Sequence, residues 1–293
     1  MQPDFTIKFW GVRGSVPTPG KATLAYGGNT SCVEVRCGEQ VIILDAGTGI
    51  YPLSQELKAK DFDILLSHTH IDHIMGFPFL SQLYDEYCRI RVWAGHLLPQ
   101  LMLESVMRRI MSPPVFPLKL EDLKAGVSFH DFHAGEDVLT PKFTRAGIRV
   151  RTLPLSHPDK ATAYRIEYAG HSICYVTDVE HRTDKLDAAL IRFINKTDFF
   201  IYDSMFDDAQ FETYKGWGHS TWQHAMRLGE AAEVGTVVLF HHDPAAGDGT
   251  LDERKKALSK MKQPSCIAQE GLVLTPQTAH SRKSSGATGL RGG

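Results

Sequence analysis

The stretch His68-Thr69-His70-Ile71-Asp72-His73 places four potential metal ligands within six residues. It directly follows the apolar segment Asp63 to Leu66, which is typical of a buried strand. Three imidazoles and a carboxylate so close together are costly to bury, and a divalent cation would compensate that cost. The spacing therefore predicts a metal-binding loop at a strand end. The first two histidines would face one ion, while the aspartate and the last histidine, beyond the turn, would face a second. The competing interpretation is a polar surface loop.

The composition favours one large domain without a strongly charged surface. The chain has 293 residues and a formal net charge of −2. This low net charge argues against electrostatic binding to long nucleic acids or anionic membranes. Its five cysteines form no CxxC motif, the first residues lack an export signal, and no apolar run approaches the roughly 20 residues of a membrane span. We therefore expect a cytoplasmic protein with no membrane partner. Residues 1–278 are expected to form the domain, and the small, polar residues 279–293 a flexible tail.

Short apolar runs rich in β-branched residues recur along the chain, and several end in a polar residue. The residues at their ends include Asp45, His157, Asp178, Asp203 and His241. Strands are rigid, and the loops that follow them can extend toward one another. We therefore expect these side chains to converge at one edge of the sheets. Helical patterns lie between the strands, at Leu97–Met111, Lys185–Phe193, Ser220–Ala232 and Asp252–Met261. This interleaving favours an α/β sandwich of two mixed sheets with outer helices.

Two sets of metal ligands can be assembled from the opening stretch and the strand ends. Two divalent ions about 3.5 to 4 Å apart would lower the pKa of a shared water and neutralise a substrate oxygen, which suits hydrolysis of a phosphate ester. The predicted ligands are His68, His70 and His157 for one ion, Asp72, His73 and His241 for the other, and Asp178 as a bridge.

Each strand-end residue also has an ordinary structural explanation when it is taken alone. His157, before Pro158, could simply be a hydrogen-bonded histidine, and Asp178 could cap a turn. His242 competes with His241 for one ligand position. We favour His241 because it continues its strand directly.

The order of short motifs along the chain resembles the metallo-β-lactamase fold, and within it the phosphodiesterase branch related to RNase Z. The motifs are HTHIDH (68–73), LPLSHP (153–158), YVTD (175–178), GHST (218–221) and LFHH (239–242). The resemblance implies an αββα sandwich, two divalent ions at the ligands named above, and a homodimer. The ions would be zinc, with manganese as the alternative.

The GHST motif resembles the histidine motif with which RNase Z type enzymes protonate the leaving group, and Asp203 lies where their glutamate partner would be. An alkoxide that leaves phosphorus needs a positioned acid, and an imidazole held by a carboxylate suits that task near neutral pH. The resemblance therefore implies that His219, oriented by Asp203, is the proton donor. Asp72 would help position a metal-bridging hydroxide that attacks phosphorus. Alternatively, Ser220 is a helix cap and His219 is merely adjacent.

The expected substrate is a small phosphodiester. RNase Z enzymes that bind tRNA usually carry a long arm between the positions of His157 and Asp178, and this interval has room for only a hairpin. The segments FWGVRGSVPTPG (9–20) and YGGNTSC (26–32) resemble bacterial and phage members that cleave cyclic nucleotides. We therefore expect hydrolysis of 3',5'-cyclic nucleotides to monophosphates. Asn29, Phe116 and Trp217 are candidates for substrate contacts, although a turn, a connector and a packing role are their alternatives.

Three rival functions stay open at this point. The same mechanism could act on RNA ends, cyclic dinucleotides or a ribose cyclic phosphate. A thioester, lactone or β-lactam hydrolase would use the same two ions but would have less need of His219 and Asp203. A ligand-binding module without catalysis is disfavoured, because no metal position is missing.

Overall fold

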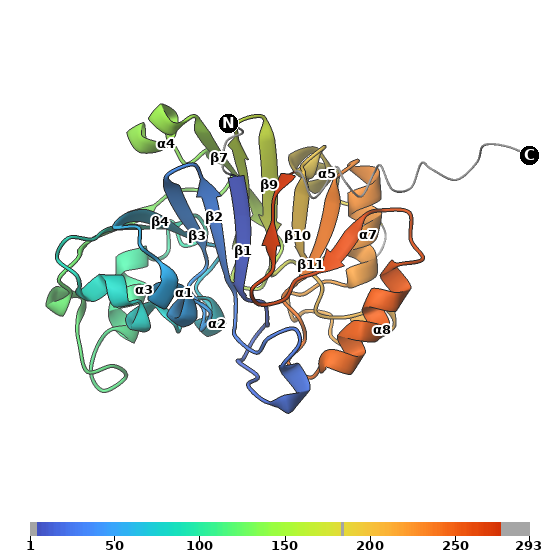
Figure 1. Ribbon diagram of the computed structural model, residues 1–293, viewed down its shortest axis with the longest axis horizontal. Helices are drawn as coiled ribbons and strands as arrows, with labels where there is room; N and C mark the ends of the chain where they lie inside the picture. The colour runs from blue at the N-terminus through green and yellow to red at the C-terminus, as the bar shows by residue number, and fades with distance from the viewer. Residues whose placement is uncertain (1–4, 183–184, 277–293) are drawn as a thin grey trace, which may run out of the picture.

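Two mixed β-sheets lie face to face in the middle of the computed structural model, and helices cover the outer face of each (Figure 1). This arrangement confirms the predicted αββα sandwich. The structure describes residues 5–182 and 185–276, so the predicted tail, 279–293, lies outside the described residues.

Seven strands within the described ranges form the first sheet: β1 (Phe5–Gly11), β2 (Cys32–Cys37), β3 (Gln40–Leu44), β4 (Asp61–Leu66), β5 (Arg89–Ala94), β6 (Gly126–Asp131) and β13 (Val273–Leu274). Their order is β13-β1-β2-β3-β4-β5-β6. The strands from β3 to β6 run parallel to one another, while β13, β1, β2 and β3 pair in antiparallel fashion.

The second sheet is built from six strands of the described chain: β7 (Ile148–Leu155), β8 (Ala161–Tyr168), β9 (His171–Val176), β10 (Phe199–Asp203), β11 (Thr236–Phe240) and β12 (Ser265–Ile267). Their order is β12-β11-β10-β9-β8-β7, and the strands from β9 to β12 are parallel. The interval between His157 and Asp178 forms the antiparallel β8–β9 hairpin, as predicted.

The described α-helices are α1 (Ile50–Glu56), α2 (Ile71–Ile74), α3 (Leu103–Ile110), α4 (Pro141–Ala146), α5 (Ala188–Ile194), α6 (Asp208–Phe211), α7 (Trp222–Ala231) and α8 (Asp248–Leu258). All four predicted helices exist, but their bounds differ. Helix α3 begins later than predicted, because the chain around Pro99 forms turns. Helix α8 begins and ends earlier than predicted. Among the helices in the described ranges, none is long and apolar enough to cross a membrane.

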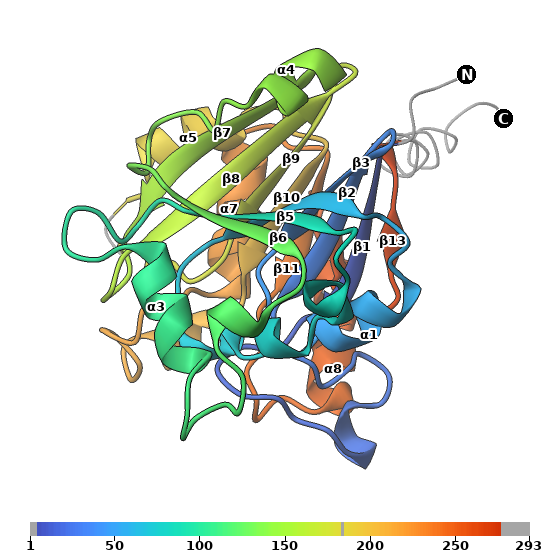
Figure 2. The ribbon, with the colours of Figure 1, turned by 90° about the vertical axis from the view of Figure 1, so that its left-hand side faces the viewer.

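Three apolar layers hold the sandwich together. The layer between the sheets includes Ile7, Val35 and Ile201, all fully buried. A second layer packs α1 and α3 on the outer face of the first sheet, and a third packs α5, α7 and α8 on the second. Burying one such side chain contributes about 1.5 to 3 kcal/mol to the stability of the fold. The strands are therefore held firmly by this core, and the positions of their ends follow from it. Figures 1 and 2 place α1, α3 and α8 toward one end of the sandwich and α4 toward the other.

Candidate metal centre

Strand ends from both sheets meet at the end of the sandwich where α2 lies. Strand β4 leads into the histidine-rich stretch and α2, while strands of the second sheet contribute from the opposite side. The structure brings four overlapping groups of ligand-type side chains together here, each with its nitrogen or oxygen atoms within 4.8 Å of one another. The groups are His68, His70 and His157; Asp72, His73 and His241; His68, His73 and Asp178; and Asp178, Asp203, His219 and His241.

The first three imidazoles direct nitrogen lone pairs toward one another without a hydrogen-bond donor between them. The Nε2 atom of His157 lies 3.2 Å from Nδ1 of His70. His68 is fully buried, and its Nε2 atom has no hydrogen-bond partner. Burial also lowers the pKa of His68 well below its usual value, so the ring is neutral and its lone pair is available. Orphaned nitrogen lone pairs that converge in this way fit a divalent cation.

The second group combines carboxylates with imidazoles. The Nε2 atom of His73 lies 3.2 Å from an oxygen of Asp72 and 3.2 Å from an oxygen of Asp178. His241 approaches the same two carboxylates at 3.4 and 3.3 Å. The other oxygen of Asp178 lies 3.8 Å from Nε2 of His68. Asp178 therefore stands between the two groups, where a bridging ligand would have to be. His242 instead donates to the carbonyl of Ala268 at 2.9 Å.

Buried hydrogen bonds orient the second group. Asp45 is fully buried and accepts from the backbone N–H and hydroxyl of Ser67 at 2.6 and 2.8 Å and from the Tyr175 hydroxyl at 2.7 Å. Its carboxylate also lies 2.7 Å from Nδ1 of His73, which directs Nε2 of that ring inward. Asp45 thus braces the ligand loop. The backbone N–H of Ser15 donates to Asp72 at 2.8 Å.

Two further contacts orient the first group. Asp159 lies 2.8 Å from Nε2 of His70, and the carbonyl of Gly218 lies 3.0 Å from Nδ1 of His157. In each ring the other nitrogen is left facing the centre. Neither Asp159 nor Ser15 is among the residues expected from the sequence. Asp159 could have been suspected from its position two residues after His157, whereas a backbone donor such as Ser15 leaves no signal in residue type.

Several residues of the centre have left-handed backbone conformations. Asp45, Asp178 and His241 have φ values of 60°, 56° and 57°, and Ser15 has 60°. Such conformations cost non-glycine residues about 1 to 3 kcal/mol and often mark functional sites. Gly14 packs so closely that a Cβ there would lie 2.4 Å from the His241 ring. The loop before Ser15 therefore requires glycine.

His219 and Asp203 form a buried pair beside these groups. Nδ1 of His219 lies 2.9 Å from Asp203 and 3.8 Å from Asp178. Burial opposes the charged imidazolium, but Asp203 and Asp178 outweigh it and raise the pKa of His219 to about 9. Ser220 is not the cap of α7, because Thr221 accepts from the backbone of the third helical residue. The pair can therefore hold a proton at the centre near neutral pH.

A cavity of about 570 Å³ adjoins the first group of ligands. His68, His70 and Asp159 form one side, and Arg109 and Lys160 bring positive charge to its lining. Its size lies within the range of small-molecule sites.

The three predicted substrate contacts do not line this cavity. Asn29 hydrogen-bonds through its side chain to Glu270 at 3.1 Å. Phe116 packs edge-on against Phe79, with ring centroids 5.7 Å apart. Trp217 is 62% exposed, immediately before the segment that contacts His157.

Comparisons with known proteins agree with this fold. A family model described as a beta-lactamase superfamily domain matches residues 40–242. Ribonuclease Z of Thermoplasma acidophilum is 23% identical over an alignment of 301 positions, which covers 87% of this chain and 93% of the relative. The metallo-beta-lactamase fold protein YhfI from Bacillus subtilis superposes with a TM-score of 0.68 at 19% identity, over 92% of this chain and 99% of that one. A diphosphatase from the PhnP family gives 0.67 at 16% identity, over 92% and 96%.

Proposed function

The chain belongs to the beta-lactamase superfamily and is a metal-dependent hydrolase, and from this premise we propose that it is a dinuclear-metal phosphodiesterase that opens 3',5'-cyclic nucleotides to nucleoside monophosphates. The observation that carries the proposal is the buried pair of His219 and Asp203 beside two ligand groups. Departure of a ribose alkoxide from phosphorus requires a proton, whereas departure of a thiolate from a thioester does not.

The ligand groups fit two divalent ions on chemical grounds. They present imidazole nitrogens and carboxylate oxygens, a donor set that suits zinc and also manganese. We assign His68, His70 and His157 to one ion, Asp72, His73 and His241 to the other, and Asp178 to both. Two such ions would activate a water for attack on phosphorus and offset the charge of the phosphate.

The side chains themselves position the reaction and move the proton. Asp72, held by the Ser15 N–H, keeps one carboxylate oxygen fixed at the centre. Asp203 holds Nδ1 of His219, so Nε2 is the atom that passes its proton to the departing 3' oxygen. The pKa of about 9 keeps this imidazole protonated near neutral pH.

The cavity beside His70 supports a small substrate. Its positive residues, Arg109 and Lys160, suit a phosphate, and its volume of about 570 Å³ suits a mononucleotide. Trp217 does not line this cavity, but it precedes Gly218, which contacts His157, and its exposed ring offers a face on which a base can stack. A cytoplasmic location and a homodimer belong to the same proposal, and light scattering in solution would test the oligomeric state.

A second candidate is processing of RNA ends, which the similarity to ribonuclease Z favours. A panel of cyclic mononucleotides, cyclic dinucleotides and short RNA, with product analysis by chromatography, separates the two. Opening of cyclic mononucleotides as the fastest reaction is the expected result. Faster cleavage of RNA would overturn the substrate assignment but not the metal chemistry.

The proton donor is tested with leaving groups of different basicity. In H219A, hydrolysis of 3',5'-cyclic AMP should fall at least about a hundredfold, because its alkoxide needs a proton. Hydrolysis of bis(4-nitrophenyl) phosphate should fall much less, because nitrophenolate leaves without one. Metal content should be unchanged, and H130A serves as the control because His130 stacks on Trp93 outside every ligand group. Equal losses on both substrates would remove His219 from the donor role.

A further inference from the structure

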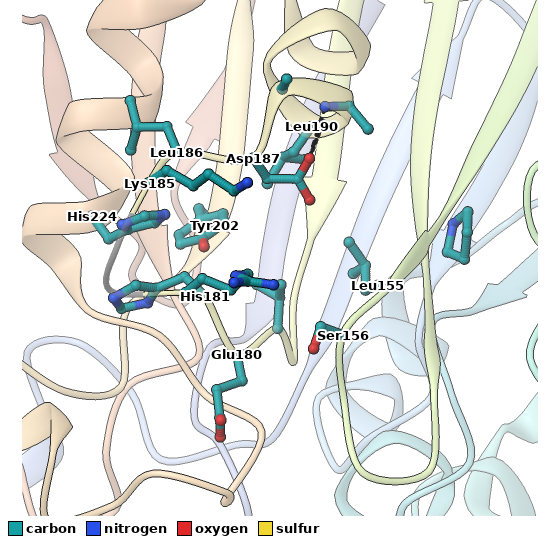
Figure 3. A pocket seen from close by; sticks show the side chains of 15 residues that line it. Leu155, Ser156, Glu180, His181, Lys185, Leu186, Asp187, Leu190, Tyr202 and His224 are labelled. Carbon is teal, nitrogen blue, oxygen red and sulfur yellow. Dashed lines mark hydrogen bonds between the residues drawn. The ribbon is translucent and has the colours of Figure 1, made fainter.

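A second cavity, of about 420 Å³, lies between α5 and α7 on the outer face of the second sheet (Figure 3). It shares no lining residue with the cavity beside His70. Apolar side chains, including Leu155, Val179 and Leu190, form much of its wall. A concave, largely apolar space of this volume, with a few converging polar groups, is typical of a small-molecule site.

His224 provides an unused hydrogen-bonding group in this wall. Its side chain is buried, with 4% of the residue exposed, and no hydrogen bond joins its imidazole to any described residue. Its ring stacks on His181, with centroids 3.8 Å apart, so the ring edge rather than the face is available. Burial lowers the pKa of His224 to about 3, which keeps the ring neutral with one donor and one acceptor. Figure 3 shows His224, His181 and Tyr202 along the same side of the cavity.

Two cations, Arg182 and Lys185, and two carboxylates, Glu180 and Asp187, line the cavity. Lys185 lines it, and no carboxylate in the described ranges forms an ion pair with its ammonium. Two acidic residues also line the cavity, but backbone N–H groups already engage both. Asp187 accepts from the first turn of α5 at 2.7 and 3.1 Å, and Glu180 accepts from Gly216 and Gly218 at 2.6 and 3.0 Å. These bonds fix both carboxylates in place, and Lys185 is the lining cation that an anionic group can pair with.

The wall of this cavity also holds the segment Gly216–Thr221 that carries His219. Nδ1 of His181 lies 2.7 Å from the Ser220 hydroxyl, and the Ser220 N–H donates to Asp203 at 3.4 Å. Glu180 fixes Gly216 and Gly218, and the latter contacts the ring of His157. A ligand that displaced residues 180 and 181 would therefore move the proton donor.

We propose that this cavity is a regulatory site for a small anionic molecule with an aromatic ring, and that its occupancy repositions the segment Gly216–Thr221. The ring would lie against the apolar wall, a polar substituent would reach His224, and the anionic group would pair with Lys185. The binding part of this proposal is independent of the phosphodiesterase activity, because no substrate takes part in it.

Titration of the full-length, zinc-loaded protein with 2-naphthalenesulfonate tests the site, because a sulfonate is a weak ligand for metal ions. We expect saturable one-to-one binding by calorimetry. The variants H224F, which keeps the stacked ring, and K185Q should each weaken it at least about threefold, the loss of one hydrogen bond or ion pair. K196Q is the matched control, because Lys196 is exposed and lies outside the cavity lining. Absence of saturation, or equal binding by all four proteins, would overturn the proposal.

The regulatory part has its own readout in the indole N–H resonance of Trp217, assigned with W217F. Trp217 lies between the two glycines that Glu180 holds, so its environment reports the position of the segment. We expect this resonance to shift as the probe saturates the protein and to shift less in H224F. An unchanged resonance at saturation would overturn the regulatory role, whatever the outcome of the phosphodiesterase assays.

Discussion

Replacement of Asp203 with Asn is expected to move the alkaline limb of the pH profile for cyclic AMP hydrolysis. One oxygen of Asp203 lies 2.9 Å from Nδ1 of His219. The other accepts from the N–H groups of Met205 and Ser220 at 3.1 and 3.4 Å. Asn preserves the shape and this second oxygen as an acceptor. The substitution therefore removes the charge that holds the proton while keeping the local backbone contacts.

The size of the effect follows from the pKa of His219, which is raised from 6.5 to about 9. Burial opposes the charged ring, and Asp203 is the largest of the groups that outweigh it. Because the donor acts in its protonated form, activity is present below this pKa and is lost as the pH rises through it. Without Asp203 the alkaline limb should move to a pH about two units lower. This shift corresponds to a loss of about 3 kcal/mol in the stabilisation of the protonated imidazole. At pH 8 the variant would retain about one tenth of the protonated donor.

The assay is the initial rate of cyclic AMP hydrolysis from pH 5.5 to 9.5, with metal content and thermal melting measured on the same samples. D252N is the control, because Asp252 contacts Tyr26 and lies outside every ligand group. An alkaline limb that stays in place in D203N, with metal content unchanged, would falsify the role of this carboxylate.

Three further predictions concern the centre and its support. D45N should lower zinc affinity about 10- to 100-fold, because it replaces the carboxylate that orients the ring of His73. Equilibrium dialysis measures the affinity, and a wild-type value would contradict this prediction. G14A should impair activity because its Cβ would meet the His241 ring, whereas G249A, in open space on α8, should raise stability by up to about 1 kcal/mol; equal activities would contradict the packing argument. Metal-free protein should melt at a lower temperature than metal-loaded protein. Ions at a hundred times Kd should add about 2.7 kcal/mol per site to the free energy of unfolding. A calorimetric scan without a shift in melting temperature would argue against binding to the folded state.

The ligand groups could be predicted from sequence because their signals are local. The spacing of His68, His70 and His73 and the polar residues at strand ends depend on strand and turn geometry, which residue type reveals. The placement of Asn29 and Phe116 could not be predicted, because it depends on which loops pack together. Asn29 meets Glu270, which is far away in the chain, and Phe116 meets Phe79. Tertiary contacts of that kind leave no periodic pattern.

The strained backbone at the centre links the core to the chemistry. Asp45, Asp178 and His241 each follow a strand closely and adopt left-handed conformations, which direct Asp178 and His241 into the ligand groups and Asp45 onto His73. Each such conformation costs about 1 to 3 kcal/mol, so it persists only where the surrounding structure holds it in place. Here the preceding strands are fully buried at Leu44 and Phe240, so the core, rather than the loops, holds the ligand geometry. A cavity-forming substitution in these strands should therefore loosen the ligand groups before it unfolds the protein, even though it touches no ligand.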